Sequence, residues 1–195
     1  MRSVFKLLVT AAAAAIVWTP APARADGYAI PWAAVQFGGK IDNVRSDVDR
    51  GRAGVGVTAG AMGAGIIGGE FDFGYSPSFF GNKSDFGHNT VIDVMGNIIV
   101  GVPVGGTHGA GVRPYVSGGV GLIRTQIDGG SLFNVSSSYN AFGWNGGAGV
   151  MGFFNERVGL RGDLRYLRVF NGNVVNGIDL GTVNYTRLSI GVVLR

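Results

Sequence analysis

The chain has 195 residues, among them 36 glycines and no cysteine, and it carries a formal net charge of +4 at pH 7. Without cysteine it has neither disulfides nor thiolate metal sites. Glycine is unfavourable in helices, and no stretch reaches the ~18 consecutive apolar residues of a transmembrane helix, so the composition argues against a helical membrane protein.

The N-terminal segment has the composition of an export signal. Arg2 and Lys6 are basic, Leu7–Val17 is apolar, and Ala23-Arg24-Ala25 has the small-x-small form of a signal-peptidase site. We expect residues 1–25 to be a cleaved signal peptide and residues 26–195 to form one β-barrel domain. Because the basic residues of the leader are lost with it, the mature chain has a charge near neutrality, and we expect no nucleic-acid partner.

Eight segments after the leader alternate between apolar and polar residues, as strands do. In chain order they are Trp32–Lys40, Arg52–Ala61, Gly65–Tyr75, Val91–Val102, Arg113–Ile127, Tyr139–Gly152, Arg157–Phe170 and Val183–Leu194. The shorter connectors are Gly60–Ala64, Pro103–Gly111 and Phe153–Glu156, and the longer ones are Ile41–Gly51, Ser76–Thr90, Asp128–Ser138 and Asn171–Thr182. Short turns on one side and long loops on the other are typical of barrels that span an outer membrane.

The seventh segment shows the alternation most clearly. One face carries Leu160 and Leu164, and the other carries Arg161, Asp163 and Arg165. A strand with charges on one face and apolar residues on the other fits a barrel with lipid outside and a polar lumen inside. A soluble lipocalin-like binder is the alternative, but it needs an apolar lumen, which the inward charges contradict.

Three motifs carry a family resemblance. They are Arg113–Gly121 (R-P-Y-V-S-G-G-V-G), Phe142–Val150 (F-G-W-N-G-G-A-G-V) and Val158–Tyr166 (V-G-L-R-G-D-L-R-Y). The chain resembles the OmpA-type eight-stranded outer-membrane β-barrel, or small porin-like, family. The resemblance implies an all-β, eight-stranded antiparallel up-and-down transmembrane barrel, which meets periplasmic chaperones, the barrel-insertion machinery, outer-membrane lipids and lipopolysaccharide. Members usually end in an aromatic residue, from which the ending Leu194-Arg195 departs.

The inward-facing charges form the main candidate site. The third and seventh strands lie opposite each other in an eight-stranded barrel, and unpaired charges in a lumen of low dielectric constant are costly, so we expect ion pairs. The predicted lumen cluster is Glu70, Asp72, Asp93, Arg161, Asp163, Arg165 and Arg187. Two interpretations remain open: a structural plug of ion pairs, or a gate that opens to a small pore.

Arg124 and Arg168 interrupt the lipid-facing pattern near the loop-side ends of their strands. We expect them to meet lipopolysaccharide phosphates, although snorkelling at the barrel rim is the alternative. Aromatic residues near strand ends predict interfacial girdles, with packing in the lumen as the alternative. They are Trp32, Tyr75, Tyr115, Phe142, Trp144 and Phe170.

The sequence therefore predicts a non-enzymatic, monomeric outer-membrane protein without cofactor or metal, which supports membrane integrity or surface interaction through its long loops. The alternatives are the small pore and a barrel-borne enzyme. An enzyme could use His88 with Ser84 and Asp85 in the second long loop. The aromatic residues Phe79, Phe80 and Phe86 of that loop are candidates for partner contact, with local packing as the alternative.

Overall fold

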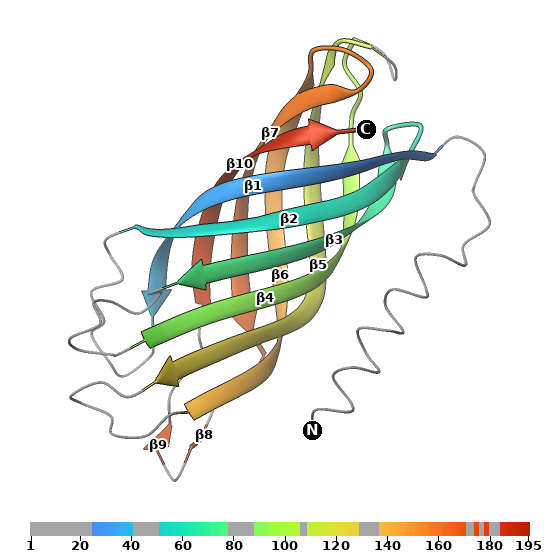
Figure 1. The fold of residues 1–195 in the computed structure, drawn as a ribbon. Helices are drawn as coiled ribbons and strands as arrows, with labels where there is room; N and C mark the ends of the chain where they lie inside the picture. Colours follow the sequence, from blue (N-terminus) through green and yellow to red (C-terminus); the bar gives the residue numbers. More distant parts are fainter. Residues whose placement is uncertain are drawn as a thin grey trace.

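A computed structural model describes residues 25–40, 51–77, 88–105, 109–128, 137–170, 174–175, 178–179 and 184–195. These residues form a closed antiparallel barrel with the strand order β1-β10-β7-β6-β5-β4-β3-β2 (Figure 1). The barrel strands are β1 (Ala25–Lys40), β2 (Arg52–Gly63), β3 (Ile67–Pro77), β4 (His88–Gly101), β5 (Gly111–Asp128), β6 (Ser137–Phe153), β7 (Val158–Val169) and β10 (Asn184–Leu194). The structure confirms the predicted eight-stranded all-β barrel.

Two very short strands, β8 (Val174–Val175) and β9 (Ile178–Asp179), pair with each other in the connector between β7 and β10. This small hairpin was not predicted from the sequence. None of the residues that the structure describes belongs to a helix long and apolar enough to cross a membrane.

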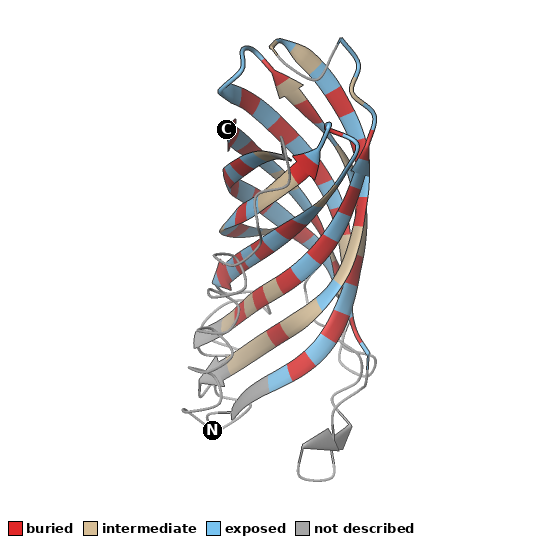
Figure 2. Ribbon diagram, turned by 90° about the vertical axis from the view of Figure 1, so that its right-hand side faces the viewer, coloured by how far each residue is buried: buried red, intermediate tan, exposed pale blue. Residues whose placement is uncertain are grey.

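Burial alternates along the strands because successive side chains point to opposite faces of the barrel wall. On β3, Glu70 and Asp72 are buried whereas Phe71 and Phe73 are exposed. Figure 2 shows this alternation as bands along the barrel wall. Large apolar side chains lie on the outside of the barrel and charged side chains lie inside. This is the reverse of their distribution in a water-soluble protein, as expected for a wall that faces lipid.

The two ends of the barrel differ in their connectors. The short connectors 64–66, 102–110 and 154–157 join strand ends at the end of the barrel where Ala25 and Arg195 lie, and we call this the turn end. The connectors 41–51, 78–87, 129–136 and 170–183 join the strands at the other end, which we call the loop end. Most of these longer connectors lie outside the described residues.

The first strand begins earlier than predicted, at Ala25 rather than Trp32. On the β2 side its pairing is continuous and includes Pro31 opposite Val57. On the β10 side the pairs stop at Ala29 with Leu194 and resume at Trp32 with Gly191. Because proline has no backbone N–H, it fits a strand only where a ladder bond is missing, which explains how Pro31 lies within β1.

Candidate functional site in the barrel interior

The lumen contains three layers of side chains. The polar layer lies at mid-height and is bounded by an apolar layer toward each end of the barrel. The apolar layer toward the loop end is Val91, Met95, Ile123, Ala141, Leu167, Val169 and Tyr185. The layer toward the turn end is Tyr28, Ile30, Met62, Ile99, Tyr115, Met151, Phe153 and Val193. The predicted ionic residues therefore lie between two apolar layers, an arrangement that was not predicted from the sequence.

The ion pairs of the polar layer cross the barrel from β7 to β3. Arg161 Nη1 lies 2.5 Å from Glu70 Oε1. Arg165 reaches the same carboxylate at 3.6 Å and Asp72 at 3.7 Å. In the barrel order, β3 and β7 are separated by β4, β5 and β6 on one side and by β2, β1 and β10 on the other. These contacts therefore join opposite walls of the barrel.

Arg187 of β10 provides a second set of contacts. It pairs with Asp72 on β3, and its Nη1 lies 3.0 Å from Asp93 Oδ1 on β4. The hydroxyl group of Tyr185 donates to the other oxygen of Asp93 at 3.3 Å. Each buried carboxylate of this group thus has a charged or hydroxyl donor, as burial requires.

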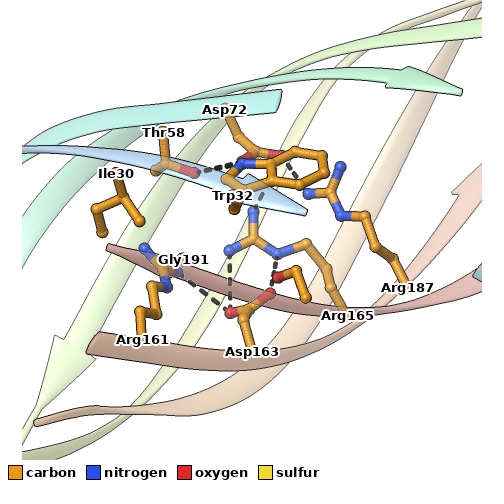
Figure 3. A pocket seen from close by; sticks show the side chains of 10 residues that line it. Ile30, Trp32, Thr58, Asp72, Arg161, Asp163, Arg165, Arg187 and Gly191 are labelled. Carbon is orange, nitrogen blue, oxygen red and sulfur yellow. Dashed lines mark hydrogen bonds and ion pairs between the residues drawn. The ribbon is translucent and has the colours of Figure 1, made fainter. Parts of the chain in front are cut away.

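Asp163 lies between two guanidinium groups on its own strand (Figure 3). Its carboxylate is 3.2 Å from Arg161 Nη2 and 3.2 Å from Arg165 Nε. It also accepts a 2.6 Å hydrogen bond from the Tyr115 hydroxyl group. Because alternate residues of a strand share a face, the charges of β7 form one contiguous row in the lumen.

Neutral side chains complete the polar layer. The Tyr28 hydroxyl group donates to Glu70 at 2.7 Å, and the Thr58 hydroxyl group donates to Asp72 at 2.6 Å. Trp32 Nε1 donates to Thr58 at 3.2 Å, and the Arg187 guanidinium carbon lies 4.3 Å from the Trp32 ring. Strand alternation is the signal that could have revealed them as inward residues, since Trp32 shares a face of β1 with the buried Gln36 and Thr58 shares a face of β2 with the buried Met62.

Gly56 makes room for Trp32 inside the barrel. A Cβ at Gly56 would lie 2.2 Å from Trp32 Cζ2 and 2.1 Å from the backbone oxygen of Phe73. Real Cβ atoms do not approach other atoms so closely, so a side chain at this position would displace the indole or the neighbouring strand.

The space left among these side chains is small. A cavity of about 10 Å³ lies among the polar residues, lined by Trp32, Thr58 and Asp72 together with the guanidinium groups (Figure 3). A volume of this size holds about one water molecule. This cavity within the polar layer is therefore too small for an organic ligand or cofactor.

The structure brings all seven residues of the predicted lumen cluster into one interior, where each is at most 5% exposed. Arg124 and Arg168 are not part of it: both lie on the outer face, Arg168 exposed and Arg124 half-buried. On β6, Arg124 pairs with Asn140 and Arg168 pairs with Trp144. The two arginines therefore flank the same outward-facing stretch of β6.

The predicted aromatic girdle is wrong for two of its six members. Trp32 is 8% exposed and Tyr115 is 4% exposed, and both face the lumen. Each shares a face with buried polar residues on its strand, so strand periodicity outweighs the preference of aromatic residues for interfaces. The other four members lie exposed: Tyr75, Phe142, Trp144 and Phe170.

Several residues named in the sequence predictions lie outside the part of the chain that the structure describes. They are residues 1–24 of the predicted signal peptide, the side chain of His88, and the loop residues Phe79, Phe80, Ser84, Asp85 and Phe86. Within the described part of the chain, no group of three or more His, Cys, Asp or Glu side chains is arranged to hold a metal ion.

Comparisons with known proteins agree with this architecture. Residues 9–195 match the family described as "Outer membrane protein beta-barrel domain". No curated protein matches the sequence.

The solved structures that share the fold include the following three. Neisserial surface protein A matches with a TM-score of 0.65 and 19% identity, covering 88% of this chain and 99% of that chain. The attachment invasion locus protein Ail of Yersinia pestis matches with a TM-score of 0.53 and 14% identity over 88% and 100% of the two chains. A major outer membrane protein from Thermus thermophilus has a TM-score of 0.50 and 14% identity over 87% and 99%.

Proposed function

The chain belongs to the outer-membrane β-barrel family. We therefore propose that it acts in the outer membrane as a closed, non-enzymatic barrel that supports membrane integrity or surface interaction. In this proposal the lumen is a structural plug. The loop end faces the cell exterior and the turn end faces the periplasm, as short turns and long loops are arranged in outer-membrane barrels. We further propose that the protein is a monomer, delivered by periplasmic chaperones and the barrel-insertion machinery.

The observation that carries this proposal is the filling of the lumen. Three arginines and four carboxylates bind one another at mid-height, and apolar layers cover them toward both ends. Side chains used in this way hold the walls of the barrel together, and the cavity among them has only the size of a water molecule. Specific recognition then belongs to the long connectors at the loop end, as is common for loops on a rigid scaffold.

We also propose that the outer face contacts lipopolysaccharide through Arg124 and Arg168. A guanidinium group binds phosphate oxygens with paired N–H donors. Trp144 lies beside Arg168 on the neighbouring strand, and its ring centroid is 5.7 Å from that of Tyr166. An arginine next to outward aromatic rings suits the boundary between acyl chains and charged headgroups.

A small pore is the second candidate, because the charged row of β7 lies in the lumen. It requires both apolar layers to move aside. An enzyme using Ser84, Asp85 and His88 is a third possibility, which substitution of these residues would test.

Cell fractionation and genetic complementation test the proposal. The protein should co-fractionate with the outer membrane and migrate differently on a gel before and after boiling. A strain lacking the protein should take up more of a hydrophobic dye, and the wild-type chain should restore the barrier. Variants with shortened connectors at 41–51 or 78–87 separate the role in membrane integrity from the role in surface interaction. If such a variant restores the barrier but no longer binds surfaces, the loops carry the recognition. A protein found in the soluble fraction without a heat-dependent shift would refute the proposal.

A further inference from the structure

Two arginines at the turn end lie apart from the polar layer. Arg113 is near the start of β5, points into the lumen and is only 2% exposed. Arg195 follows β10 and is half-buried. Neither takes part in an ion pair with any described residue, whereas every arginine of the polar layer has a carboxylate partner.

Both guanidinium groups contact the same aromatic ring. The guanidinium carbon of Arg195 lies 3.7 Å from the centroid of Phe153, and that of Arg113 lies 5.2 Å from it. Met62 and Gly65 fix Arg113 from the other sides: its Nη1 is 3.9 Å from Met62 Sδ, and a Cβ at Gly65 would lie 2.6 Å from its Cζ. These contacts hold the side chain in place but supply no negative charge.

Several nitrogen atoms of this pair lack an acceptor. The Nε of Arg113 and the Nε and Nη2 of Arg195 are buried without a hydrogen-bond partner among the described residues. The two arginines repel each other, and Asp26 attracts Arg113 without forming an ion pair with it. Buried guanidinium N–H groups are costly when unsatisfied, so the pair favours an anionic acceptor.

We infer that the turn end of the lumen is a binding site for a phosphate group, held by Arg113 and Arg195 over Phe153. Phosphate oxygens accept from the paired N–H donors of guanidinium groups, and one phosphate neutralises two neighbouring cations. The bound phosphate group belongs either to free inorganic phosphate or to the headgroup of a lipid. The headgroup is within reach because Phe154, in the adjacent connector, is 65% exposed, as a residue that meets acyl chains would be. The site itself does not depend on the proposed function. Only the compartment that supplies the phosphate depends on the proposed orientation, in which the turn end faces the periplasm.

Ligand titration of the full refolded chain in phosphate-free micelles tests this inference. Inorganic phosphate, added at constant ionic strength against chloride, should broaden its ³¹P signal and raise the unfolding midpoint of the barrel. Arg113→Gln and Arg195→Gln should each weaken binding by about tenfold, the loss expected for a charged hydrogen-bonding partner. Arg157→Gln is the matched control, since Arg157 lies at the same end and is exposed. It should bind as the wild type does.

A second titration with a short-chain phosphatidylglycerol distinguishes the two sources. Tighter binding of this lipid than of phosphate, lost in the Arg195→Gln variant, supports a lipid headgroup. Binding of phosphate without competition by the lipid supports free phosphate. The inference is overturned if neither ligand binds the wild type, or if the double variant binds as well as the wild type. Arg195 is half-buried, so its variant remains informative if Arg113→Gln fails to fold. Both residues lie at the end away from the long loops, so a negative result leaves the proposed function intact.

Discussion

Arg161 on β7 and Glu70 on β3 are joined across the width of the barrel, with a second contact of 3.2 Å between Arg161 Nη2 and Glu70 Oε2. This two-point contact holds a carboxylate and a guanidinium group in the favoured parallel geometry. It also links strands that share no edge. The pair therefore stabilises the cross-section of the barrel itself rather than any one hairpin.

Removing either partner of this pair should destabilise the barrel. Glu70→Ala and Arg161→Ala should each lower the free energy of unfolding by about 3 kcal/mol, because each removes the closest partner of a buried charge and leaves only a longer contact, Arg161 with Asp163 or Glu70 with Arg165. The double variant should lose clearly less than the sum of the two. Urea unfolding in micelles, followed by tryptophan fluorescence, measures the free energy of unfolding of the wild type, the two single variants and the double variant. Additive losses would show that the pair contributes no coupling.

The protein should not conduct ions. In planar lipid bilayers both the wild type and Arg161→Ala should give no single-channel steps, since the two apolar layers remain in place when one arginine is removed. The heat-denatured protein controls for leakage caused by poor insertion. Discrete steps in the wild type, enlarged by Arg161→Ala, would favour the gated pore over the plug.

Two glycines of the barrel wall should respond differently to the same substitution. Gly56→Ala should lower the free energy of unfolding by about 1–3 kcal/mol, because the new methyl group would overlap Trp32 and the backbone of Phe73. Gly162→Ala is the matched control, since Gly162 is exposed and a Cβ there meets nothing within 4 Å. It should be neutral. Urea midpoints measure both effects, and equal losses in the two variants would contradict the close packing described for Trp32.

The outward arginines should retain lipopolysaccharide during purification. The Arg124→Ala/Arg168→Ala double variant should carry less lipopolysaccharide through extraction than the wild type, as measured by phosphate and sugar analysis of the purified protein. Arg157→Ala, at the opposite end of the barrel, should retain the wild-type amount. Unchanged retention in the double variant would favour simple snorkelling of these side chains.

The sequence predicts the faces of the strands well because strand periodicity is strict. Once Glu70 is placed inside, Asp72 must share its face and Phe71 must not. The opposition of the third and seventh strands follows from strand number alone in a closed barrel. Both features are consequences of backbone geometry, so no long-range information was needed to predict them.

The contents of the lumen were harder to predict because they depend on packing between distant strands. Trp32 and Tyr115 were assigned to a membrane interface on residue type, although their positions on the strands place them inside. Tyr28 precedes the predicted start of its strand, so its hydrogen bond to Glu70 could not be inferred. Which apolar side chains meet in a layer depends on the register of eight strands, which the sequence pattern alone does not specify.

The interruption at Pro31 has a consequence for the order of folding. Every other pair of adjacent barrel strands is joined by one connector, which between β7 and β10 contains the β8–β9 hairpin. The strands β1 and β10 instead come from the two ends of the barrel sequence, as in the pairing of Ala29 with Leu194. Closing so large a loop has the greatest entropic cost of any strand pairing, so we expect this seam to form after the hairpins. Pro31 also lies at this interface and donates no ladder bond. The backbone amides of β1 are therefore expected to exchange with solvent before those of β5 and β6, so that the barrel opens at the boundary where its two ends meet.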